Sequence, residues 1–180
     1  MNIGTLLRSW LACTLGCLPL LILLLVPKLM RSRAGDERLL LIGTALLLLL
    51  LVAAFVCAPI MTAWFDPVRG NWDRRTALRS TRRGWRHSTG GAVIALCVGI
   101  LIYALGQMAG YMLGTLVPYV SDNPAHVSDP SQPRWVIHYT AYALQALILY
   151  AVATLAVAWY GWRMRTLHLR KTIRQSAARR

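Results

Sequence analysis

Four long apolar runs, separated by polar connections, dominate the pattern of residues along the chain. They cover about residues 10–27, 39–61, 91–117 and 136–160. Because an α-helix rises 1.5 Å per residue, about twenty apolar residues cross the roughly 30 Å hydrocarbon layer of a membrane. The pattern therefore predicts an all-α, polytopic membrane protein, folded as a bundle of four transmembrane helices in a single membrane domain over residues 1–180.

The first two runs differ in their interruptions. Pro19 lies within the first run, where it removes a backbone donor and predicts a kink. The second run contains six consecutive leucines, Leu46 to Leu51, and few small residues, so much of its surface is expected to face lipid. Pro59 and Trp64 are expected to mark its end at the membrane interface.

A glycine stripe marks the third run. Steps of four and seven residues keep its members on one helical face: Gly91, Ala95, Gly99, Gly106, Gly110 and Gly114. Lipid provides no hydrophobic drive for helices to associate, so small residues act by letting two backbones approach closely. We expect this stripe to be the main helix-packing surface, with the alanine-rich fourth run as its partner.

Two glutamines are predicted to meet across that helix pair. Gln107 precedes Pro118 by eleven residues and Gln145 follows Trp135 by ten. Both amides should therefore lie about 15 Å from the same membrane boundary, where a buried amide needs a partner. The contact could be direct or pass through one of three tyrosines: Tyr103, Tyr111 or Tyr142. We expect a polar clamp between helices rather than a solute-binding site.

Composition and charge support the membrane class. The 180 residues are 57% hydrophobic and only 14% charged, which is too apolar for an ordinary soluble domain. The net charge of +14 would suggest nucleic-acid binding in a soluble protein. Here the basic residues lie almost wholly between and after the apolar runs, where they orient a membrane protein.

The connection over residues 66–87 combines arginines with tryptophans. Its candidate contact residues for anionic lipid or a partner are Arg74, Arg75, Arg79, Arg82, Arg83, Arg86, Trp72 and Trp85. Such a segment can lie on the membrane surface, with tryptophans at headgroup depth and guanidinium groups on phosphates. A solvated loop whose arginines only fix the topology fits equally well. A nucleic-acid surface is disfavoured, since the segment holds no recognisable binding fold.

The connection over residues 118–135 is rich in proline and slightly acidic, which predicts an irregular extracytoplasmic loop. Four residues in and after it could be offered as a metal site: Asp122, His126, Asp129 and His138. The prolines leave these residues without a helical register, so a metal site is disfavoured. We expect the four side chains to cap, turn and solvate the loop instead.

The basic tail over residues 163–180 is expected to continue the fourth helix to about Gln175. The positive-inside rule places this tail, the arginine-rich connection and both termini in the cytoplasm, with fifteen basic residues inside and five outside. Four of the five basic residues outside go against the positive-inside rule, because they lie between the first two runs and would be translocated: Lys28, Arg31, Arg33 and Arg38. Either the first run does not fully cross, or a partner holds the hairpin.

The sequence contains no pattern typical of catalysis or ion transport. No Asp, Glu, Lys or Arg lies within the four runs, which argues against a pump or a transporter of charged substrates. Neither a nucleophile with a base, nor a phosphate-binding loop, nor the paired histidines of a metalloenzyme is present. No enzymatic activity, cofactor or metal is therefore expected.

Elimination leaves two functional hypotheses. The first is a non-enzymatic, multi-pass subunit or accessory protein of a larger assembly in the bacterial inner membrane, such as a secretion or conjugation apparatus. The second is a small oligomeric channel or permease for an uncharged solute. Expected partners are anionic headgroups on the cytoplasmic side and other membrane proteins. A homo-oligomer is compatible with the sequence, whereas specific nucleic-acid binding is not expected.

Overall fold

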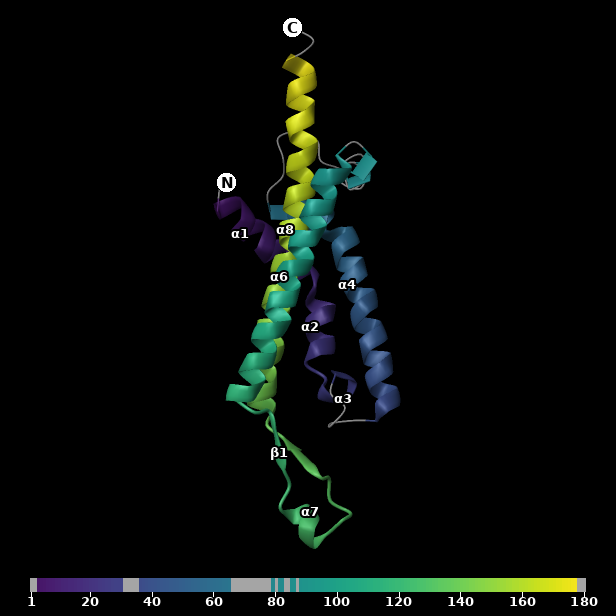
Figure 1. Ribbon diagram of the computed structural model, residues 1–180, viewed down its shortest axis with the longest axis vertical. Coiled ribbons are helices and arrows are strands. Elements are labelled where there is room, and N and C mark those ends of the chain that lie inside the picture. The colour runs from purple at the N-terminus through teal and green to yellow at the C-terminus, as the bar shows by residue number, and fades with distance from the viewer. Residues whose placement is uncertain are drawn as a thin grey trace. The chain divides into compact units, whose positions relative to one another are not determined.

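Helices make up most of the protein in a computed structural model that describes residues 3–30, 36–65, 79, 81–82, 85–86 and 88–177 (Figure 1). Three helical segments are long and apolar enough to cross a membrane: Glu37–Ala63, Thr89–Leu116 and Tyr139–Leu167. Helices α1 (Ile3–Gly16) and α2 (Leu18–Leu24) add a fourth span if they are counted together. The chain is therefore a mostly helical, multi-pass membrane protein, as predicted, with three or four spans.

The first apolar run is broken rather than kinked at its proline. Helix α1 ends at Gly16, and α2 begins at Leu18 and is followed by the short α3 (Pro27–Met30). Pro19 thus lies in the first turn of α2, where its missing N–H interrupts no intrahelical hydrogen bond. The break precedes the proline because the ring crowds the turn before it.

Helix α4 (Glu37–Phe65) ends one residue after Trp64. Pro59 lies inside this helix and is fully buried, so the helix itself does not end there, while the place of Pro59 and Trp64 at the membrane interface stays a prediction. Burial against protein lets a membrane helix tolerate an internal proline, because neighbouring groups replace the lost hydrogen bond. Only 11% of the most apolar part of α4 is buried, against 50% for the last span, which leaves most of the leucine-rich surface uncovered by protein.

Packing divides the chain into two compact units. The first unit comprises Met1–Cys17, Val52–Ala104 and Val152–Arg180, and the second comprises Leu18–Leu51 and Leu105–Ala151. Helices α4, α6 (Thr89–Leu116) and α8 (Tyr139–Ala177) contribute to both units. Each unit is described separately below.

Helix α8 is the centre of the first unit. The Trp10 indole N–H on α1 donates to the Thr154 hydroxyl at 3.1 Å, and the Phe55 ring on α4 packs edge-on against Tyr160. The residues of α8 between these contacts are mostly small and buried: Ala156, Val157 and Ala158. Helices α1 and α4 therefore both pack against the same stretch of α8.

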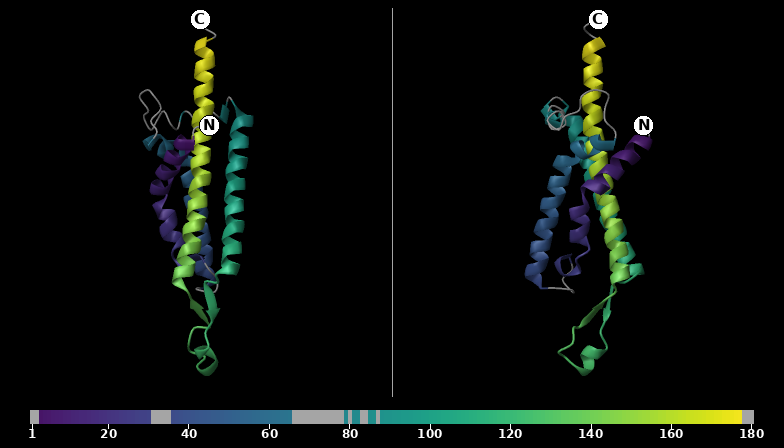
Figure 2. Two further views of the ribbon diagram at one scale, coloured as in Figure 1. Left: turned by 90° about the vertical axis from the view of Figure 1, so that its left-hand side faces the viewer. Right: turned by 180° about the vertical axis from the view of Figure 1, so that it is seen from behind.

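A short β-hairpin distinguishes the second unit. Strand β1 (Val120–Asp122) pairs antiparallel with β2 (Trp135–Ile137), and the one-turn helix α7 (Ala125–Ser128) lies between them. In both views of Figure 2 this hairpin continues from neighbouring ends of α6 and α8. The irregular loop that the sequence predicted is thus partly ordered, because its prolines lie outside the paired residues and leave the ladder intact.

Candidate functional site

The small residues of the predicted stripe occupy the covered face of α6. Ala95, Gly99, Gly106 and Gly110 are buried, and Gly91 and Gly114 are partly buried. Large apolar neighbours such as Ile94, Leu101 and Met108 are instead exposed. The role of the stripe as the main packing surface stays a prediction, with which these positions are compatible.

Contacts at two stripe glycines show how closely α8 approaches in each unit. In the first unit, a Cβ atom added to Gly99 would lie 3.6 Å from the Ala156 carbonyl oxygen, an ordinary contact distance. In the second unit, a Cβ atom added to Gly110 would lie 2.5 Å from Cδ2 of Leu149. A larger side chain at position 110 would therefore have to displace Leu149.

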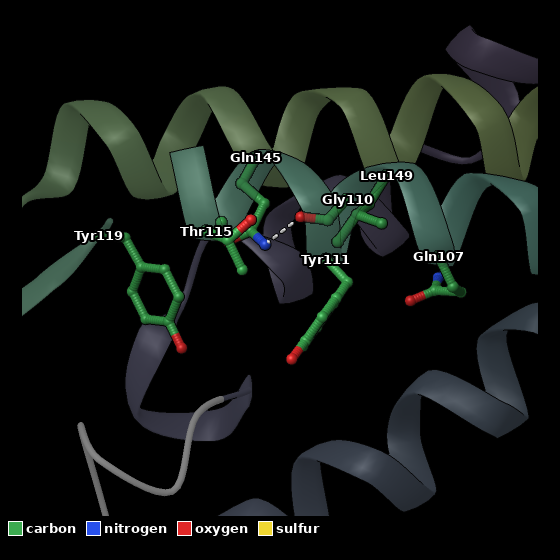
Figure 3. A pocket seen from close by; sticks show the side chains of 8 residues that line it. Gln107, Gly110, Tyr111, Thr115, Tyr119, Gln145 and Leu149 are labelled. Carbon is green, nitrogen blue, oxygen red and sulfur yellow. Dashed lines mark hydrogen bonds between the residues drawn. The ribbon is translucent and has the colours of Figure 1, made fainter. Parts of the chain in front are cut away.

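A cavity of about 390 Å³ lies between α6 and α8 in the second unit. Eight residues line it: Gln107, Gly110, Tyr111, Gly114, Thr115, Tyr119, Gln145 and Leu149 (Figure 3). Its volume falls at the lower end of the roughly 300–1,000 Å³ typical of small-molecule pockets. A Cβ atom on Gly114 would lie 2.9 Å from Nε2 of Gln145, so the absence of a side chain at Gly114 leaves space for the Gln145 amide.

Gln145 is anchored to the wall of this cavity. Its side chain is only 5% exposed, and Nε2 donates to the Gly110 carbonyl oxygen at 2.7 Å (dashed line in Figure 3). Gln107 lines the same cavity, three residues before Gly110 on α6. The structure thus brings the two glutamines to one cavity, while the expected contact between their amides stays a prediction.

The three tyrosines considered as intermediates take different positions. Tyr111 lines the cavity. Tyr142 donates its hydroxyl to the Leu24 carbonyl at 2.6 Å, which attaches α8 to the end of α2. Tyr103 belongs to the first unit.

The arginine-rich connection is described only in part. Four of its candidate contact residues lie outside the described residues: Arg74, Arg75, Arg83 and Trp72. Arg79, Arg82 and Arg86 are exposed, whereas Trp85 is half-buried and donates its indole N–H to the Tyr160 hydroxyl at 3.0 Å. This hydrogen bond attaches the connection to α8 a few residues before the basic tail begins.

Sequence reasoning missed the role of Arg165, which it assigned to the basic tail. Arg165 is 3% exposed, and its Nη1 donates to the Thr62 carbonyl oxygen at 2.7 Å. Thr62 is among the last four residues of α4, whose carbonyls have no partner within the helix. A guanidinium group there also meets the negative end of the helix dipole. Arg165 therefore caps α4.

The loop residues considered as metal ligands take part in local hydrogen bonds. His138 Nε2 lies 3.0 Å from the Ser121 hydroxyl, and His126 Nδ1 donates to the Gln132 carbonyl at 2.7 Å. The Ser131 hydroxyl and backbone N–H both donate to Asp129 and hold its pKa below the ordinary value. Within the described ranges, no group of three or more His, Cys, Asp or Glu side chains could hold a metal.

Comparison of the chain with protein-family models, curated protein sequences and solved structures gave no match. A functional assignment therefore depends on the chemistry and placement of the residues themselves.

Proposed function

We propose that this chain is a non-enzymatic, multi-pass subunit or accessory protein of a larger assembly in the bacterial inner membrane, such as a secretion or conjugation apparatus. The observation that carries the proposal is a hydrogen bond that holds the arginine-rich connection against α8 just before the basic tail begins. Trp85, in the arginine-rich connection, is hydrogen-bonded to Tyr160, just before the basic tail. Arginines carried by the connection and by the tail near this contact suit the docking of an acidic partner.

The direction of α4 and α8 supports the same arrangement. Gly161 lies against the backbone of Ala58, and four residues later Arg165 bonds to Thr62, which lies four residues after Ala58. The two helices therefore run in the same direction in the first unit. If both cross the membrane, the connection after α4 and the tail after α8 begin on the same side. The positive-inside rule makes that side cytoplasmic.

Three exposed arginines make this surface suitable for a specific partner. Arg79, Arg82 and Arg86 are all exposed on the connection that Trp85 anchors. Planar guanidinium groups bind carboxylates in a bidentate geometry, which gives directional recognition as well as attraction. Attachment of the connection through Trp85 restricts its backbone before binding, which would lower the entropic cost of docking. Acidic residues on a cytoplasmic partner are the matching chemistry.

Isolation of the full-length protein from membranes of its native host tests this function. Quantitative mass spectrometry should find larger proteins co-purifying in fixed stoichiometry in mild detergent. The triple variant Arg79→Glu, Arg82→Glu, Arg86→Glu should lose them while keeping its melting temperature. Arg134→Glu, which reverses one charge on the hairpin, is the control and should keep them. A homo-oligomer with no stoichiometric partner would contradict the proposal and favour the channel or permease.

The cavity is the observation that favours this second function. Its eight lining residues are all uncharged, and several bear hydrogen-bonding groups, as an uncharged solute requires. A permease would carry that solute across proteoliposome membranes, whereas an assembly subunit has no need to do so. Solute uptake by the isolated chain therefore distinguishes the two functions.

A further inference from the structure

We propose that the cavity of the second unit is a binding site for an uncharged, hydroxyl-rich group. Such a group can come from a free sugar or from the sugar headgroup of a membrane lipid. The assembly role does not require this site, and the proposal stands on the cavity itself. Four features of its lining carry the argument: unpaired polar groups, a preformed wall, neutrality and position along the span.

Two lining side chains present polar groups that the described part of the chain leaves without a hydrogen-bond partner. These are the Gln107 amide and the Tyr111 hydroxyl, both on the membrane-spanning helix Thr89–Leu116. The Tyr111 side chain is 75% exposed, and Figure 3 shows both groups beside the open space of the cavity. Polar groups left open on a membrane-spanning segment are suited to binding a polar ligand that enters the cavity.

Other parts of the cavity wall are already organised. Gln145 is fixed by its bond to the Gly110 carbonyl, and Thr115 donates its hydroxyl to the Met112 carbonyl at 2.7 Å. With its proton used, the Thr115 oxygen can only accept further hydrogen bonds. Leu149 supplies an apolar side to the cavity. A ligand would therefore find fixed groups rather than having to order them, which favours binding.

The lining chemistry selects the ligand class. None of the eight described lining residues is charged, so an ionised ligand would enter without a counter-charge and would be disfavoured. A purely apolar ligand would leave the amide and phenol groups unpaired. Hydroxyl groups donate and accept, as amides and phenols do, and the rings of Tyr111 and Tyr119 offer apolar faces for the C–H faces of a sugar.

The cavity extends from the membrane surface into the span. Tyr119 follows the end of α6 at Leu116, and Gln107 lies nine residues before that end. Nine residues correspond to about 14 Å along a helix axis, roughly half of the hydrocarbon thickness. A free sugar could therefore enter from solution, and a lipid headgroup could enter while its chains stay in the bilayer.

Binding measurements on the full-length protein in phosphatidylcholine nanodiscs, prepared without sugar-based detergent, test the site. One arm titrates glucose by calorimetry, and the other measures retention of a monoglucosyl diacylglycerol by native mass spectrometry. We expect binding in at least one arm, and the arm that responds identifies the source. Gln107→Leu and Tyr111→Phe should each weaken it by about tenfold. Neither change should prevent folding, because each replaces a polar group with an apolar one inside a span.

Tyr139→Phe is the matched control, because Tyr139 is 64% exposed in the same unit but does not line the cavity. This variant should bind as the unaltered protein does. The proposal is overturned if neither probe binds, or if Gln107→Leu and Tyr111→Phe bind as tightly as the control. If neither probe binds and Gln107→Leu dissociates a homo-oligomer, the polar groups are instead satisfied by a second copy of the chain.

Discussion

A Cβ atom added to Gly161 on α8 would stand 2.7 Å from the backbone carbonyl oxygen of Ala58 on α4. The obstacle is backbone, which cannot rotate away as the end of a long side chain can. Glycine at this position therefore sets how closely α4 and α8 approach in the first unit. The same approach brings Arg165, one turn later, within hydrogen-bond distance of Thr62.

Replacing Gly161 with alanine should destabilise the protein by about 1–3 kcal/mol, the usual effect of overpacking a well-packed interior. The added methyl group must push α4 and α8 apart. Gly90→Ala is the control, because a Cβ atom built there would meet no described atom within 4 Å beyond its chain neighbours and the backbone of its own helix. Thermal unfolding followed by circular dichroism in micelles should show a lower melting temperature for Gly161→Ala alone. Equal melting temperatures of the two variants would show that α4 and α8 can move apart without loss of stability.

Removal of the Arg165 side chain should also be destabilising. Arg165→Met leaves the Thr62 carbonyl without the bond that caps α4, and hydrogen bonds to charged groups contribute about 1.5–3 kcal/mol. Arg165→Lys keeps the charge at the helix end and should lose less stability than Arg165→Met. Arg163→Met removes the same charge two residues earlier and serves as the control. If both methionine variants unfold at the same denaturant concentration, the cap has no energetic role.

The long helices could be predicted from the sequence because membrane crossing depends on the length of an apolar run, which is a local property. The residues at which the helices end could not be predicted in the same way. Pro59 stays within α4 because the helix is packed around it, and that packing is not written in the neighbouring residues. The strand pair Val120–Asp122 and Trp135–Ile137 escaped prediction because each three-residue strand is stabilised by a partner distant in sequence.

The residues of the candidate site were likewise predicted only in part. Spacing along α6 indicated which small residues share a face, and depth along two helices brought Gln107 and Gln145 to the same cavity. Gly161 and Arg165 were missed because they follow the fourth run, among tryptophans and arginines typical of a membrane interface. Their four-residue spacing does indicate that both lie on one helical face. That this face packs against α4 could not be predicted, because sequence alone did not identify Ala58 and Thr62 as its neighbours.

Acidification should loosen the hairpin at Asp129. The Ser131 hydroxyl and backbone N–H bind the ionised carboxylate and lower the pKa of Asp129. Their contribution is complete above the ordinary Asp pKa of about 3.9 and is lost as the pH falls through the lower pKa of the folded protein. In an NMR titration, Ser131→Ala should raise the pKa of Asp129 toward its ordinary value. Ser128→Ala, whose hydroxyl bonds to Ala125 instead, should leave it unchanged.

Reporter fusions should map the connection after α4 and the tail to the same side of the membrane, because α4 and α8 run in the same direction in the first unit. A reporter after Arg180 should give a cytoplasmic signal, and one inserted near Asn123 in the hairpin should give an outside signal. One inserted near Arg33, before α4, should also lie outside, because the segment Glu37–Ala63 is long enough to cross. A cytoplasmic signal there would mean that α4 does not span.

A reporter before Ile3 decides how the broken pair of helices α1 and α2 sits in the membrane. If the two helices together form one span, this reporter lies in the cytoplasm, opposite the one near Arg33, and the chain crosses four times. If the break at Cys17 instead turns the chain back, both reporters lie outside and only three spans remain. We expect the cytoplasmic result. Arg8 then stays inside, and translocation of the basic residues before α4 is the only departure from the charge rule on that hairpin.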